Sequence, residues 1–269
     1  MRVIRFSLWD ATRLTLFGVL LCGIATSAWS APDADALIRK SNQAIKANTE
    51  YTRMQMDLLD PQGAVEQTRS LEVYFKHYSD HEVTLQKFLA PPIIQGSGLL
   101  IVDHYTPVND IWMYLPTTRR LRRIAGAEKS NRYMGTEFSY EDFEDYQTQS
   151  YRFDLLKQKP CMTDRHCTLV VATPATDEER GASNYGKKIY WIESISLYPV
   201  RVDYYDKQDK LIKTLNVTKL AKYGHYWLPV DLFMENQLNQ RRTRVLTLER
   251  RVDKPMDDRF LSKRYLRTE

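Results

Sequence analysis

The sequence has few of the residues that mark unusual chain classes: among 269 residues there are 3 cysteines, 10 glycines and 11 prolines. So little glycine and proline excludes a collagen-like or low-complexity chain. Neither charge sign dominates, because 39 Lys and Arg face 34 Asp and Glu, and this mild excess does not require nucleic acid as a partner. With 43% hydrophobic residues and a mean hydropathy of −0.51, the chain is too apolar for disorder and too polar for a polytopic membrane protein.

Aromatic residues, in contrast, are plentiful, and tyrosine leads them with 17 residues against 9 Phe and 5 Trp. Tyrosine combines an apolar ring with a hydroxyl that can stay hydrated. This combination suits β-strands that are half exposed or that line a cavity.

The first thirty residues have the three-part layout of a secretory signal peptide. Three arginines precede an apolar run at residues 14–25, which small residues follow up to Ser30. The run is too short to span a bilayer comfortably, so we expect cleavage after Ser30 and a mature domain of residues 31–269. An uncleaved anchor is the alternative. Lipidation at Cys22 is disfavoured because Leu21 occupies a position that requires a small residue.

Two cysteines remain in the mature chain, Cys161 and Cys167, within KPCMTDRHC. In an exported protein, this spacing predicts a short loop closed by a disulfide. The alternative is a metal site helped by His166, but it has only three candidate ligands and lacks a second cysteine pair. We therefore expect a disulfide and no metal or other cofactor.

Hydrophobic periodicity predicts a mainly antiparallel β protein with few helices, of the α+β class. Residues 34–48 form an amphipathic helix with Asp33 as its N-cap. From about residue 51 onward, roughly ten short strands alternate with turns, which indicates a single domain built on a strongly curved or nearly closed sheet. Residues 126–146 interrupt the strands, and Ser139 followed by Asp142 predicts a capped helical turn there.

Motifs of catalysis are absent from the sequence, since it has no G-x-S-x-G, no H-E-x-x-H and no glycine-rich phosphate loop. A metal site at His77 and His81 is disfavoured because a turn separates them. Five acidic residues in the insert could supply paired carboxylates, yet such a cluster more often forms a solvated face. These residues are Glu137, Glu141, Asp142, Glu144 and Asp145. We therefore expect a protein that is not an enzyme.

Four arginines surround Leu121 and form the sharpest charged feature. They are Arg119, Arg120, Arg122 and Arg123. Guanidinium groups bind carboxylates and phosphates in a bidentate manner, so the run suits anionic head groups or an acidic partner surface. The alternative is charge compensation inside the protein by the acidic cluster twenty residues later.

Three segments in order resemble the family of LolA-like outer-membrane lipoprotein-sorting proteins, in a less characterised branch. The first is FLAPPIIQGSGLL at residues 88–100, in which two prolines interrupt a strand and an apolar run follows. The second is WMYLP at residues 112–116 with the arginine run, and the third is MGTEFSYED at residues 134–142. The resemblance covers roughly residues 34–266.

The resemblance implies an incomplete barrel whose concave apolar face is covered by helices and binds acyl chains. It also implies a periplasmic carrier that acts toward the outer membrane, with an RND-type inner-membrane transporter and an outer-membrane acceptor as partners. The helix at residues 34–48 and the insert at 126–146 are the candidate lids. The expected cavity or lid residues are Leu37, Ile38, Phe88, Leu99, Leu100, Trp112, Tyr114, Phe138, Tyr140 and Phe143.

Two other functions compete with a lipid or lipoprotein carrier. An envelope lipid hydrolase would need Ser139, Glu141 and a histidine around an ester, and that triad is not visible in the sequence. A non-transporting accessory protein would use the arginine run to dock on an exporter or an anionic membrane.

Overall fold

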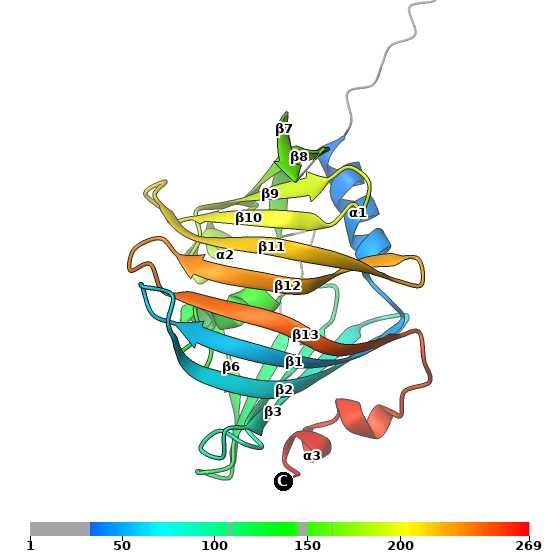
Figure 1. Ribbon diagram of the computed structural model, residues 1–269, viewed down its shortest axis with the longest axis vertical. Helices are drawn as coiled ribbons and strands as arrows, with labels where there is room; N and C mark the ends of the chain where they lie inside the picture. The colour runs from blue at the N-terminus through cyan, green and yellow to red at the C-terminus, as the bar shows by residue number, and fades with distance from the viewer. Residues whose placement is uncertain (1–32, 107–108, 145–149, 163, 269) are drawn as a thin grey trace, which may run out of the picture. The chain divides into compact units, whose positions relative to one another are not determined.

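Thirteen antiparallel strands form one open, strongly curved sheet in the computed structural model, which describes residues 33–106, 109–144, 150–162 and 164–268 (Figure 1). The predicted signal peptide and Asp145 lie outside the described residues. The strands are β1 (Thr49–Leu59), β2 (Val65–His77), β3 (Glu82–Ala90), β4 (Gly98–Asp103), β5 (Asp110–Leu115), β6 (Arg120–Ile124), β7 (Tyr151–Met162), β8 (Arg165–Pro174), β9 (Lys187–Glu193), β10 (Pro199–Tyr205), β11 (Leu211–Tyr223), β12 (Tyr226–Asn236) and β13 (Arg242–Val252).

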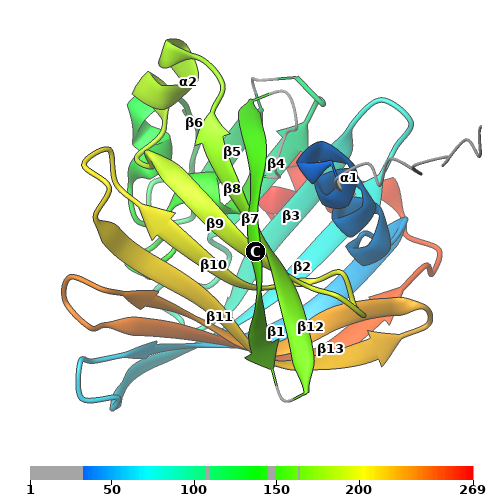
Figure 2. The same cartoon turned by 90° about the horizontal axis from the view of Figure 1, so that it is seen from above.

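The sheet order is β6-β5-β4-β3-β2-β1-β13-β12-β11-β10-β9-β8-β7, so β6 and β7 are free edges. The predicted incomplete barrel with few helices is thus confirmed (Figure 2). The predicted number of strands, roughly ten, is lower than the thirteen observed. Strand β7 was not predicted, because its sequence is rich in charged residues and contains Pro160. An edge strand tolerates such residues.

The helices are short and lie outside the sheet layer. They are α1 (Ala34–Ile45), α2 (Asp177–Ala182) and α3 (Lys263–Leu266), with 3₁₀ turns η1 (Gly126–Ser130), η2 (Tyr140–Phe143) and η3 (Asp258–Leu261). As predicted, the Asp33 side chain caps α1 by accepting from the Asp35 amide at 3.1 Å. No helix of the described residues has the length and apolar character needed to cross a membrane.

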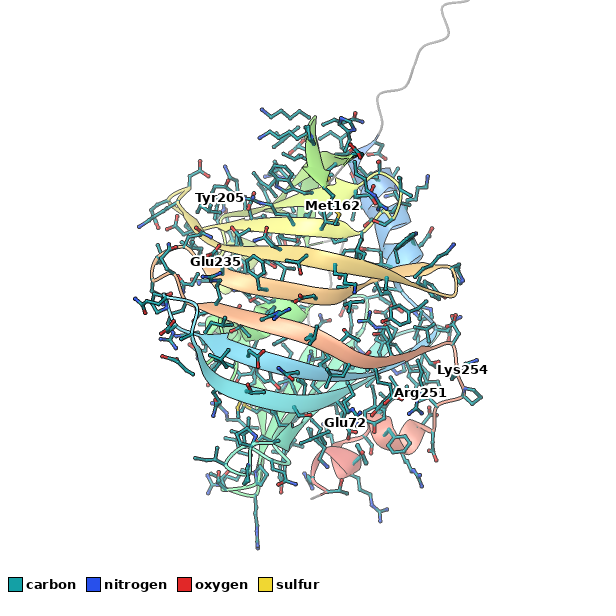
Figure 3. All side chains as sticks on the ribbon, in the orientation of Figure 1. Glu72, Met162, Tyr205, Glu235, Arg251 and Lys254 are labelled. Carbon is teal, nitrogen blue, oxygen red and sulfur yellow. A yellow bond between two sulfur atoms is a disulfide. The ribbon has the colours of Figure 1, made fainter. Side chains whose placement is uncertain are left out.

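Side-chain alternation along β4 sends its residues into two different apolar clusters. In β4, Leu99 and Ile101 join the cluster on the concave face, and Leu100 joins a cluster on the outer face. The C-terminal segment with η3 and α3 covers this outer cluster (Figure 1). Glu72, on the outer face, accepts a hydrogen bond from the Tyr265 hydroxyl at 3.0 Å (Figure 3). The sheet is therefore buried on both sides along β3 to β5.

The predicted disulfide between Cys161 and Cys167 is confirmed, with Cα atoms 5.7 Å apart. The two cysteines lie in the paired strands β7 and β8 rather than in a free loop. Because their sulfur atoms are joined, they are not available as thiolate ligands for a metal.

Replacing both cysteines by serine should lower the free energy of unfolding by at most about 2–3 kcal/mol, because the closed loop is short. Urea titration of the oxidised wild type and the double variant would measure this loss. Reduced wild type is the control and should behave like the variant. A loss above about 5 kcal/mol would contradict a purely local role.

Candidate ligand-binding interior

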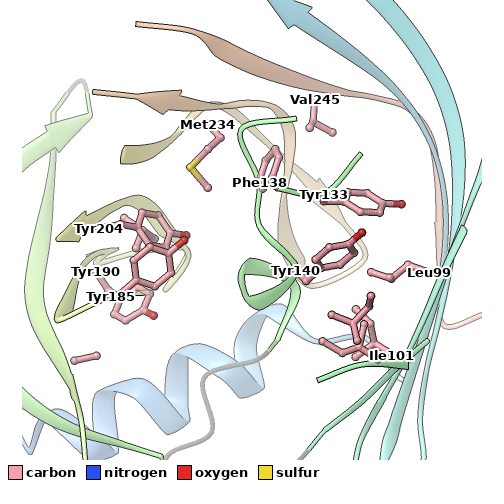
Figure 4. Close-up of a cluster of buried hydrophobic side chains, with 14 of the residues drawn as sticks. Leu99, Ile101, Tyr133, Phe138, Tyr140, Tyr185, Tyr190, Tyr204, Met234 and Val245 are labelled. Atoms are coloured by element: carbon pink, nitrogen blue, oxygen red, sulfur yellow. The ribbon is translucent and has the colours of Figure 1, made fainter. Parts of the chain in front are cut away.

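The segment between β6 and β7 turns into the concave side of the sheet instead of crossing its surface. Figure 4 shows Tyr133, Phe138 and Tyr140 between the two arms of the sheet. The ring of Tyr133 packs 5.8 Å from that of Phe88 and 5.0 Å from that of Phe143, centroid to centroid. Residues 126–144, which we call the plug, thus supply a large part of the interior apolar surface.

Asp142 ties the plug to the sheet through a buried ion pair. Its carboxylate pairs with Lys213 of β11, and its side chain is only 1% exposed. The same carboxylate accepts from the Tyr185 hydroxyl at 2.8 Å and from the Ser139 amide at 2.7 Å, which completes the predicted capped turn. Burial alone would raise the pKa of Asp142, but the Lys213 ammonium holds it below its usual range.

Glu141 lies beside this pair and is also buried. Its carboxylate accepts from the Ser183 hydroxyl at 2.8 Å and from the Asn184 amide at 3.2 Å. Burial raises the pKa of Glu141, although the Lys188 ammonium of β9 opposes this shift. Lys188 is itself buried, and its ammonium lies 5.0 Å from the ring of Tyr185.

A second set of contacts joins the plug to β12, β13 and β2. Glu137 pairs with Arg132 and accepts from the Asn236 side chain of β12 at 2.9 Å. Its backbone amide donates to the hydroxyl of Thr243 in β13, also at 2.9 Å. Arg69 of β2 donates to the Met134 carbonyl at 2.8 Å. Polar contacts to strands of both arms therefore hold the plug inside the curve.

The expectation of a solvated acidic face is wrong. Glu137, Glu141 and Asp142 are buried, and Glu144 pairs with Lys129 at 2.6 Å. Each of these carboxylates meets a cation or several donors, which removes most of the penalty for burying it. The polar positions of MGTEFSYED are thus attachment points, and its aromatic positions fill the core.

Two adjoining cavities lie under the C-terminal end of α1. One of ≈ 250 Å³ has a mixed lining, in which charged side chains such as Glu50 and Arg250 accompany apolar ones. The apolar residues come from α1, the sheet and the plug and are Ile45, Phe75, Ile101, Phe143 and Leu228. The other, of ≈ 330 Å³, includes His77 and Tyr105. Both are bordered by Lys46 and Glu82, whose side chains form an ion pair at 2.7 Å.

The anchoring of α1 over these cavities is lighter than that of the plug. Its buried residues are Ala34, Ile38 and Ser41, and the Ser41 hydroxyl donates to the Leu197 carbonyl at 2.7 Å. Figure 2 shows α1 at the open side of the curved sheet. Both candidate lids therefore lie on the concave side, and α1 is the one with fewer polar attachments.

Comparisons with known proteins agree with this geometry. A family model described as "Uncharacterized protein" matches residues 80–268. The chain belongs to this family. Its fold is LolA-like, as the sequence resemblance implied: a domain named as an outer membrane lipoprotein-sorting protein from Vibrio parahaemolyticus superposes with a TM-score of 0.79 at 24% identity, over 87% of this chain and 98% of that one.

Two further solved structures share the LolA-like fold. A DUF1329 family protein from Desulfovibrio piger has a TM-score of 0.79 at 24% identity and covers 87% of this chain and 97% of its own. A LolA superfamily protein from Nitrosomonas europaea has a TM-score of 0.68 at 16% identity, over 87% of this chain and 100% of that one. No curated protein matches the chain.

Within this LolA-like fold, the ten expected cavity or lid residues fall into two groups. Seven belong to or pack against the concave cluster: Leu37, Ile38, Phe88, Leu99, Phe138, Tyr140 and Phe143. Leu100, Trp112 and Tyr114 lie together on the outer face, against the C-terminal segment. The structure therefore brings the first group together around the interior and separates the other three from it by the thickness of the sheet.

The arginine run forms the edge strand β6 and the turn before it. Arg122 pairs with Glu128 at 2.8 Å and Arg123 with Asp110 at 2.6 Å. Within the described residues, the alternative of compensation by the acidic cluster is wrong, because Glu137, Asp142 and Glu144 pair with other cations and Glu141 accepts from Ser183 and Asn184. Arg119 and Arg120 are exposed and, among the described residues, have no ion-pair partner.

The hydrolase alternative finds no triad in the LolA-like interior. Ser139 contacts Asp142, Tyr185 at 3.1 Å and Lys213 at 3.3 Å, and no histidine of the described residues is hydrogen-bonded to it. Nor do the described His, Cys, Asp and Glu side chains form a group of three or more that could hold a metal ion.

The sequence analysis did not identify two buried lysines of the sheet: Lys213, which pairs with Asp142, and Lys188, whose positive charge acts on Glu141. A signal was present, since Lys188 lies on the same face of β9 as the inward-facing Tyr190 and Ile192. A lysine at an inward position of a half-buried strand needs a buried counter-charge. The nearby acidic motif could therefore have been matched to it.

Proposed function

We propose that this protein is a periplasmic carrier, without catalytic activity, that binds acyl chains of a lipid or lipoprotein inside its curved sheet for transfer toward the outer membrane. The observation that carries the proposal is the apolar concave face, covered by two segments that are not part of the sheet. The lipoprotein-sorting domain of the same fold supports it. An RND-type transporter and an outer-membrane acceptor would load and unload the carrier.

Free energy makes such capture feasible. Burying an acyl chain gains about 0.8 kcal/mol per CH₂, so a chain of about sixteen carbons gains on the order of 10 kcal/mol. This gain can extract a lipid from a membrane without a covalent step. A carrier of this kind needs an apolar interior and an entrance, and no nucleophile.

Cavity size indicates that cargo enters only after a movement. Pockets that enclose a whole small ligand occupy about 300–1,000 Å³. The cavity of ≈ 250 Å³ under α1 has room for part of an acyl chain along its apolar side. Displacement of α1 would enlarge this cavity, because Ile45 and Lys46 form part of its wall. The plug would stay in place, since the buried Asp142–Lys213 ion pair holds it to the sheet.

The direct test is to identify what the protein carries. Mature protein purified from the periplasm should contain acyl lipid in roughly stoichiometric amount, detected by mass spectrometry of an organic extract. Lipid should disappear after washing with a detergent that fills the cavity and return on incubation with vesicles. A protein that neither retains nor takes up lipid would contradict the carrier proposal.

A further inference from the structure

We propose that one end of the sheet, built by the β3–β4 loop, the β5–β6 turn and α3, docks on the surface of an anionic phospholipid membrane. This docking surface lies outside the interior, so the inference does not depend on which cargo the interior holds. It rests on three observations: the register that brings the segments together, their uncompensated positive charge, and an exposed apolar loop tip.

Strand register places the two hairpin ends side by side. Lys87 pairs with Gly98, Gly98 with Tyr114, and Tyr114 with Leu121, so one row crosses β3 to β6. Directly beyond this row, the β3–β4 loop and the β5–β6 turn leave the same end of the sheet. A Cβ at Gly96 in the loop would lie 3.2 Å from Pro116 in the turn, which confirms their proximity.

The C-terminal helix α3 is attached at the same row. The Lys87 ammonium donates to the carbonyls of Tyr265 and Thr268, at 3.4 and 2.5 Å. The Leu266 side chain packs so closely on Gly98 that a Cβ there would lie 2.7 Å from it. Figure 1 shows α3 and the C-terminus at this end of the sheet.

These segments carry positive charge that the described part of the chain does not neutralise. Five exposed basic residues have no ion pair there: Arg119, Arg120, Lys263, Arg264 and Arg267. Of these, Lys263 lies with its ammonium 3.4 Å from the centroid of the Trp112 ring. Arg122 and Arg123, which sequence reasoning included, are excluded because each has an acidic partner.

An apolar tip accompanies these charges. Ile93, at the end of the β3–β4 loop, is 76% exposed, and Leu89 beside the loop is 36% exposed. Pro91 and Pro92 stiffen the loop, and the Ile94 and Gln95 amides donate to the Pro91 carbonyl at 3.0 Å. A rigid loop thus presents a large aliphatic side chain to solvent at little further entropic cost.

A basic surface around an exposed aliphatic tip fits an anionic bilayer better than a free anion. The charges are spread over separate segments and do not converge on one point, as a phosphate site would require. Anionic head groups attract each basic side chain near the surface, and the isoleucine can enter the boundary between head groups and acyl chains. We therefore expect membrane binding that requires both features.

Sedimentation with vesicles tests this proposal. Wild type should bind vesicles in which roughly a third of the phosphatidylcholine is replaced by phosphatidylglycerol, and should bind pure phosphatidylcholine weakly. The variant Arg119→Gln/Arg120→Gln/Arg264→Gln should lose about tenfold to a hundredfold in binding. Ile93→Ser should lose several-fold, and raising salt from about 0.1 to 0.5 M should weaken binding of wild type.

A matched control removes the same charge elsewhere. Lys207→Gln/Lys210→Gln/Lys222→Gln changes three exposed lysines of β11 and the turn before it, and should bind like wild type. Equal losses in both triple variants would overturn the proposal, because net charge alone would then explain binding. The proposal would also be overturned if wild type failed to bind anionic vesicles, or if the triple arginine variant bound them as wild type does. Lipid extracted from the interior of each variant reports separately on the carrier proposal.

Discussion

Replacing Asp142 by asparagine should lower the free energy of unfolding by about 3–5 kcal/mol at neutral pH, since it leaves the buried Lys213 ammonium without its counter-charge. Asparagine keeps the size of the side chain and can still accept the Ser139 amide, so the loss reports mainly on charge. Lys213→Met should lower the free energy of unfolding by a similar amount, because it leaves the buried Asp142 carboxylate without its counter-charge. Chemical denaturation of the three proteins measures these differences.

The pH dependence of this effect has a defined sign. The pKa of Asp142 is depressed in the folded state, so the ion pair stabilises the fold above the unfolded-state value of about 3.9. Its contribution is lost as the pH falls through the folded-state pKa. The gap between wild type and Asp142→Asn should therefore be full at neutral pH and should narrow in acid below about pH 4.

An exposed ion pair provides the control. Asp209 pairs with Lys187, and its side chain is 71% exposed. Asp209→Asn should change stability by no more than about 1 kcal/mol, because solvent screens such pairs. If Asp142→Asn behaved like this control, the buried pair would not be what holds the plug in the sheet.

The Asp142–Lys213 ion pair also shows which contacts can be predicted from the sequence and which cannot. The helix cap at Asp33 and the capped turn from Ser139 to Asp142 were predictable, because each involves residues three or fewer apart. The partner of Asp142 was not, since Lys213 lies 71 residues away and only the curvature of the sheet brings it close. An acidic cluster therefore resembles a solvated face in the sequence, because cations from distant strands, such as Lys213, cannot be placed beside it.

Strand alternation has a similar limit. It assigns Leu99 and Leu100 to opposite faces, and the structure places them in different clusters. Alternation cannot tell which face is concave, because both faces of β4 are apolar. In the structure, the C-terminal segment covers Leu100, Trp112 and Tyr114. This packing identifies their face as the outer one.

The carrier proposal predicts that one substitution in the cavity removes most of the bound lipid. Thr84 of β3 faces inward and lines the cavity of ≈ 250 Å³ under α1. Thr84→Trp should fill much of this space and reduce bound lipid to roughly a tenth of the wild-type amount or less. Overpacking should cost about 1–3 kcal/mol of folding free energy, so the fold should survive.

A tryptophan elsewhere on the sheet separates blocking of the cavity from a general effect of the larger side chain. Thr218 of β11 is exposed and borders neither cavity under α1, so Thr218→Trp should retain lipid as wild type does. Extracted lipid per mole of folded protein is the measurement, and circular dichroism verifies folding. Wild-type lipid content in folded Thr84→Trp would mean that acyl chains bind outside this cavity. The outer face under α3 would then be the next apolar surface to test, because the C-terminal segment would have to leave it for a chain to enter.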